Sequence, residues 1–107
     1  MKEIYWMGST QDDLTAASAS VRRTMGGSLR TAQQGGKSQD ASPMSGDLRD
    51  VLEVRADDDG CTHRLMYTTT IGDVLYVLDF FQKKSKSGIA APKADLDRIS
   101  QRLKKST

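Results

Sequence analysis

The sequence contains only one cysteine and one histidine in 107 residues. Cys61 has no second cysteine to bond, so the chain forms no internal disulfide, which fits a protein of a reducing compartment. One cysteine and one histidine are too few for a zinc site of the Cys/His type. We therefore predict no metal and no cofactor.

Long apolar runs are also missing. No stretch is long enough to cross a bilayer, and the N-terminus Met1–Ile4 has neither a long apolar core nor a cleavage-site pattern. We expect a cytoplasmic, soluble protein without a membrane partner. A length of 107 residues predicts one domain, residues 1–107, with a single modest core.

Acidic residues are scarce at the C-terminal end. Residues 83–107 contain 8 Lys and Arg but 2 Asp and Glu, a net charge of +6, whereas residues 1–82 contain 8 and 12, a net charge of −4. A basic C-terminal quarter is typical of proteins with a phosphate-bearing or otherwise acidic partner. Ordinary surface lysines near a helix end give the same imbalance, so both interpretations stay open.

The first third of the chain has the pattern of a short strand and a helical region. Lys2–Met7 is rich in bulky apolar residues and predicts a strand. Ser9–Asp12 resembles a capping box and predicts a helix start. The Ala/Ser-rich stretch Ala16–Ser20 can divide this region into two helices, and Gly35–Gly36 ends it. Apolar residues at spacings of three and four form its buried stripe: Leu14, Ala17, Val21, Met25, Leu29 and Ala32.

Three strands and a final helix follow a polar loop over residues 37–47. The strands are predicted over Leu48–Arg55, Cys61–Thr69 and Val74–Phe81, with a turn at Asp57–Gly60 between the first two. Pro92 opens the last helix, whose apolar stripe is Leu96, Ile99 and Leu103. The order β-α(α)-β-β-β-α predicts an α+β fold. We expect an antiparallel sheet with the helices packed on one face, and Val21, Met25 and Leu29 buried against three consecutive strands.

The third of these strands changes character abruptly at its end. Val74–Phe81 is apolar on both faces except for Asp79, which predicts an interior strand covered on both sides. Lys83, Lys84 and Lys86 then follow without an acidic residue among them. These lysines either hold positive charge at a surface or act as solubilising gatekeepers after a hydrophobic strand, and the residues do not decide between the two.

No nucleophile triad, phosphate-binding glycine loop, dinucleotide fingerprint or zinc helix is present. The remaining chemistry lies in cations that the sheet brings together, namely Arg55, Arg64, Lys83 and Lys84. Such a cluster suits phosphodiester chemistry, because the planar fork of an arginine holds a phosphate and further cations stabilise developing charge. For Arg64 alone, a structural ion pair with Glu53 across the hairpin is the stronger interpretation.

Several segments together resemble the HigB-like, phage-derived branch of the RelE/ParE toxin superfamily. The resemblance covers nearly the whole chain, and the segments are specific in combination rather than singly. The matching segments are Tyr5–Ser9, Ala32–Lys37, Leu52–Arg55, His63–Tyr67, Tyr76–Lys86 and Ala91–Pro92.

This resemblance implies a RelE-like fold and a type II toxin of a toxin–antitoxin pair, which cleaves messenger RNA on the ribosome without a metal by 2′-hydroxyl attack. It implies a helix-turn-helix antitoxin protein, the ribosome and mRNA as partners. Arg64 falls on the family's strand arginine, and Lys84, with Lys83 beside it, falls on the basic exit from its last strand, so these three are the predicted catalytic residues. Arg64 and Lys84 would clamp phosphate, and Lys83 would support RNA binding or proton transfer. The further RNA-binding positions are Arg55, Lys86 and Lys37.

Two departures from the family pattern bear on activity. Asp79 stands where many relatives have a histidine, which removes a possible general base and places a carboxylate near the cations. Ser42 and Ser45 stand where relatives tend to have lysines. His63 has the chemistry of an acid or base, but alternation places it on the face opposite Arg64, which favours a packed or edge histidine.

Two other functions are compatible with the same residues. One is a ParE-like inhibitor that binds DNA gyrase and cleaves nothing, for which the basic site would be incidental. The other is a phage-associated interaction protein that has the toxin fold without activity.

Overall fold

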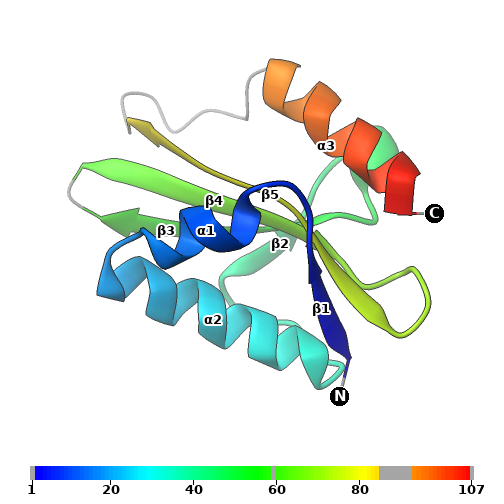
Figure 1. Cartoon of the computed structure of the whole chain (residues 1–107), viewed down its shortest axis with the longest axis horizontal. Coiled ribbons are helices and arrows are strands. Elements are labelled where there is room, and N and C mark those ends of the chain that lie inside the picture. The colour runs from blue at the N-terminus through cyan, green and yellow to red at the C-terminus, as the bar shows by residue number, and fades with distance from the viewer. Residues whose placement is uncertain (1, 59, 85–92, 107) are drawn as a thin grey trace.

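Five strands form one mixed sheet, and the α-helices pack on its two faces (Figure 1). The computed structural model describes residues 2–58, 60–84 and 93–106. No helix in these ranges is both long and apolar enough to span a membrane. In chain order the elements are β1 (Glu3–Trp6), α1 (Thr10–Thr15), α2 (Ala19–Gln33), β2 (Ala41–Pro43), the 3-10 helix η1 (Gly46–Leu48), β3 (Leu52–Asp58), β4 (Cys61–Thr68), β5 (Val74–Lys84) and α3 (Lys93–Ser106).

The strand order across the sheet is β1-β5-β4-β3-β2. β3, β4 and β5 are consecutive antiparallel neighbours, so the predicted meander is confirmed. The prediction of a purely antiparallel sheet is wrong, because β1 pairs with β5 in parallel, from Glu3 opposite Val74 to Trp6 opposite Val77. The chain leaves β1 through α1 and α2, enters the sheet at the opposite edge and reverses at each following strand. β5 therefore returns beside β1 in the same direction.

The sheet separates two hydrophobic cores, one on each face. α2 buries Val21, Met25 and Leu29 on the first face, as predicted, against strand residues that include Leu65 and Tyr67. On the second face Ile99 of α3 is fully buried in the cluster of Leu48, Val51, Met66 and Leu78. Figure 1 shows α2 and α3 on opposite sides of the strands.

The expectation that all helices share one face is therefore wrong. Both faces of β5 are apolar, so each face of the sheet needs packed side chains or a helix over it. Leu75 and Val77 of β5 belong to the first core, whereas Leu78 belongs to the second.

The helical region divides at the predicted stretch. α1 ends at Thr15, and α2 begins after Ser18, whose hydroxyl oxygen accepts a hydrogen bond from the Val21 N–H at 3.3 Å. The predicted capping box is wrong, since the Ser9 hydroxyl makes no cap bond and instead donates to the Asp13 carboxylate at 2.8 Å. α2 ends at Gln33, and Gly35 follows with a φ of 91°, which glycine adopts without strain.

The segment predicted as a loop contains the edge strand β2. Ala41–Pro43 pairs with β3, and Pro43 is placed at an edge, where its missing N–H removes no central hydrogen bond. The next strand starts four residues later than predicted, because Gly46–Leu48 forms η1. β3 then extends through Asp58, and Gly60 turns the chain with a φ of 75°.

A β-bulge in β5 changes the alternation of its side chains. Met66 pairs with Asp79 and Tyr67 with Val77, so Leu78 is the extra residue. Leu78 packs in the α3-side core, and the Asp79 carboxylate contacts α3 as well. The bulge thus turns two consecutive side chains toward the same helix.

Candidate functional site

Two arginines are adjacent on the sheet face that α3 covers. Arg55 of β3 is directly opposite Arg64 of β4 in the register, so the two side chains share a face. Met66, two residues beyond Arg64, packs in the core with Ile99 of α3, which identifies that face. We call the part of this face that carries Glu53, Arg55 and Arg64 the arginine face.

Arg64 forms an ion pair with Glu53 across the β3–β4 hairpin. The Arg64 Nη1 and the Glu53 Oε2 are 3.3 Å apart, and the side chains are 6% and 17% exposed. The structural pair considered from the sequence is therefore present. Glu53 is thus more accessible than Arg64. Arg55, on the same face, is exposed.

The end of β5 borders the same two strands. Its register pairs Lys83 with Thr62 and Lys84 with Cys61, two and three residues along β5 from Phe81, the partner of Arg64. The backbone thus brings both predicted lysine positions within three residues of Arg64 along the ladder. Their side chains and all of Lys86 lie outside what the structure describes.

Lys37 lies away from this group. It follows the end of α2, and the neighbouring Ser38 hydroxyl is 2.8 Å from the Ser28 hydroxyl of that helix. Because α2 covers the face opposite Arg64, the fold does not bring Lys37 to the arginine face.

Asp79 fastens α3 to the sheet. Its Oδ2 accepts hydrogen bonds from Arg98 Nη2 at 2.7 Å and Arg98 Nε at 3.0 Å. Its Oδ1 accepts from the Phe80 N–H at 3.0 Å and is 3.4 Å from Arg102 Nη1, which also donates to the Leu78 carbonyl at 2.7 Å. The carboxylate is 6% exposed, and burial of such a charge requires this pairing.

The sequence reasoning missed this network. Two features indicated it: a lone carboxylate in an apolar strand needs a cationic partner, and Arg98 and Arg102 are one helical turn apart on a basic helix. Asp79 was expected near the cations of the predicted site, whereas in the structure its carboxylate pairs with two arginines of α3.

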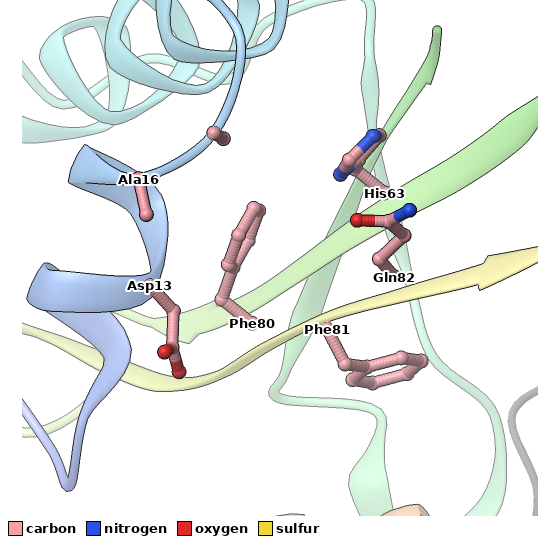
Figure 2. Close-up of a pocket in the computed structure, with 7 residues that line it drawn as sticks. Asp13, Ala16, His63, Phe80, Phe81 and Gln82 are labelled. Carbon is pink, nitrogen blue, oxygen red and sulfur yellow. The ribbon is translucent and has the colours of Figure 1, made fainter. Parts of the chain in front are cut away.

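A recess of about 370 Å³ lies on the opposite face, between α1 and the ends of β4 and β5. His63 is on this face, 7% exposed and stacked on Phe80 with ring centroids 6.2 Å apart, so the expected packed histidine is confirmed. Figure 2 shows Phe80 and His63 on one side of β5, with Phe81 pointing to the other side. The residues that line the recess are Asp13, Ala16, Ala17, His63, Phe80, Phe81 and Gln82.

Among the described residues that line the recess there is no lysine or arginine. Among the residues the structure describes, no group of three or more His, Cys, Asp or Glu side chains is placed to hold a metal ion. The positions suited to an anion are those of the arginine face and the end of β5.

Fold and charge together define a small α+β protein whose central sheet places Arg55 and Arg64 on one face, with the Lys83 and Lys84 positions at the end of β5. Residues 12–104 match the family described as phage derived protein Gp49-like (DUF891). The chain belongs to this family, which is RelE/toxin-like. This membership is consistent with a toxin of a toxin–antitoxin system in general. No curated protein and no solved structure matches the chain.

Proposed function

We propose that the protein is a HigB-like type II toxin that cleaves messenger RNA on the ribosome. The observation that carries this proposal is the cross-strand pair of Arg55 and Arg64. Lys83 and Lys84 on β5 pair with β4 residues two and three positions from Arg64. Family membership supports the toxin class, and the cationic positions supply the chemistry that phosphodiester cleavage needs.

In the proposed reaction the ribose 2′-hydroxyl attacks the adjacent phosphorus, and the bond to the 5′-oxygen breaks. Negative charge grows on the phosphate oxygens during this step. Arg64 and Lys84 would stabilise that charge, and Lys83 would support RNA binding or proton transfer. Arg55 and Lys86 would hold the flanking RNA backbone, while Lys37 would make a separate contact from the α2 side.

The proposed partner that controls this activity is a helix-turn-helix antitoxin. An acidic or RNA-excluding surface on such a protein would neutralise the arginine face by covering it. We expect a purified complex to reduce the accessibility of Arg64, Lys83 and Lys84. RNA cleavage that remains intact in the complex, with these residues accessible, would contradict the proposed mode of control.

Induction of the chain in cells, followed by mapping of new messenger 5′ ends, tests the proposed function. The proposal predicts new ends within translated messages and none when translation initiation is blocked. Arrest of growth with intact messages and inhibited gyrase would instead identify a ParE-like inhibitor. Normal growth and intact messages would identify an interaction protein without toxin activity.

A further inference from the structure

We propose that Glu53 is the general base that removes the proton from the attacking 2′-hydroxyl, and that Arg64 positions it. This inference rests on the proposed ribonuclease function. It gives the ion pair a catalytic role in addition to its structural one.

The carboxylates of this face differ in what they already bind. Asp79 accepts hydrogen bonds from Arg98 and from the Phe80 N–H, and it is 6% exposed. Asp57 accepts a hydrogen bond from the Thr62 hydroxyl at 2.8 Å. Glu53 has a looser contact, 3.3 Å from Arg64, and a side chain that is 17% exposed. Of these three carboxylates, Glu53 is the one that forms an ion pair with Arg64, and its side chain remains partly accessible to a substrate hydroxyl.

The surroundings of Glu53 suit a phosphodiester with its ribose. Arg64 on β4 holds the carboxylate, and Arg55 on β3 is exposed on the same face, two residues along the strand. On β2 the register partner of Glu53 is Ser42, a small exposed side chain. A base paired with one guanidinium group, with a second arginine two residues along the same face, allows the phosphate and the 2′-hydroxyl of one nucleotide to be bound together.

The charges around this base are distributed over all the packed elements. Arg55 and Asp57 share β3 with Glu53, and Arg64 faces it from β4. The register partner of Glu53 on β4 is Met66, and the partner of Met66 on β5 is Asp79. The Asp79 carboxylate is bound by Arg98 and Arg102 of α3. Among the described side chains, the α3 arginines thus bind Asp79, and Arg64 contacts Glu53.

The step balances with a single proton transfer at the base. The 2′-oxygen forms a bond to phosphorus while its proton passes to a Glu53 carboxylate oxygen. The bond from phosphorus to the 5′-oxygen breaks, and the leaving oxygen takes a proton from solvent. The products are a 2′,3′-cyclic phosphate and a 5′-hydroxyl end, and Glu53 returns its proton to solvent.

Single-turnover cleavage of mRNA on programmed ribosomes, measured across pH, tests this role. Glu53→Gln should slow cleavage by about 10²- to 10⁴-fold, the usual contribution of a general base. The rise of the rate with pH on the acidic side should disappear, and ribosome binding should change little. Asp57→Asn is the matched control, because it removes one carboxylate from the same strand and face, and it should keep the wild-type profile.

Glu53→Asp keeps the charge of the ion pair but withdraws the carboxylate by one methylene. It should fold, cleave at least tenfold more slowly and retain a pH-dependent rate, since misplacement of a base by about 1 Å costs up to 10²-fold. Folded Glu53→Gln that cleaves at the wild-type rate overturns the inference and leaves the proposed function intact. If Glu53→Gln does not fold, a wild-type rate and pH profile for Glu53→Asp overturns it. Absence of cleavage by the wild-type protein removes the proposed function and this inference together.

Discussion

At the scale of single residues, Asp79 has a role that its position in the chain did not suggest. The family resemblance in the sequence implies a histidine at this position, and on that basis Asp79→His would be expected to restore a base and raise activity. In the structure its carboxylate binds Arg98 and Arg102 of α3. A histidine has one fewer acceptor and no fixed negative charge, so the substitution would release α3 rather than restore a base.

Asp79→Asn should therefore lower the free energy of unfolding by about 2–3 kcal/mol, the range for hydrogen bonds to charged groups. The change is to be measured by urea denaturation, with Asp73→Asn as the control. Asp73 is an exposed carboxylate just before the same strand, and its loss should change stability by less than about 0.5 kcal/mol. Equal stabilities for the two variants would show that Asp79 does not hold α3.

Tyr67 is the second residue with a measurable consequence. It is fully buried, its hydroxyl has no hydrogen-bond partner among the described residues, and burial raises its pKa above the ordinary value of 10.0. The folded state therefore favours the protonated phenol, so stability is complete below about pH 10 and falls as the pH rises beyond it.

Tyr67→Phe removes this ionisable group and a buried hydroxyl that has no partner among the described residues. We expect the variant to be at least as stable as the wild type at pH 7 and to lose less stability between pH 9 and pH 11. Thermal unfolding at a series of pH values measures both effects. A parallel decline in the two proteins would mean that other groups cause the alkaline loss.

At the scale of secondary structure elements, the sequence predicted which helices and strands form better than it predicted how they are arranged in the fold. The helical stripe of Val21, Met25 and Leu29 and the three-strand meander are present because periodicity and turn residues determine them locally. The parallel pairing of β1 with β5 and the edge strand β2 depend on distant partners. No local pattern in the sequence reports them.

The position of α3 distinguishes the observed fold, with helices on both faces of the sheet, from the predicted fold, with all helices on one face. Ile99 is fully buried against the second face, so Ile99→Ala should cost about 2–4 kcal/mol of unfolding free energy. Gln101→Ala, an exposed position on the same helix, should cost less than about 0.5 kcal/mol. Equal urea midpoints for the two variants would contradict the second core.

The candidate site was only partly predictable, because local spacing in the sequence determines some of its contacts and the packed structure determines the others. Arg55 and Arg64 could be placed together because hairpin spacing sets their register. The bulge at Leu78 could not be read from an alternating pattern, and it is what turns Asp79 toward α3. The ion pair between Arg64 and Glu53 was foreseen as a structural feature. Its unequal exposure, which supports the proposed role of Glu53, required the packed structure.

At the scale of the whole molecule, the sheet separates two chemically different faces. Arg55 and Arg64 share one face with the α3 arginines, whereas His63 and the recess lie on the other. A partner that docks at the recess would leave the arginine face accessible. An antitoxin that blocks RNA cleavage is therefore expected to contact the α3 side.

The central claim is that the arginine face and the end of β5 cleave RNA. Its most direct test is single-turnover cleavage of mRNA on programmed ribosomes without divalent-metal dependence of the chemical step. Wild-type protein should cut, and Arg64→Lys should cost about 1–3 kcal/mol in cleavage, because it keeps the charge but loses the planar fork. Lys84→Ala should reduce the cleavage step more than ribosome affinity. If folded Arg64→Ala and Lys84→Ala proteins both cut at the wild-type rate, the nuclease site is elsewhere.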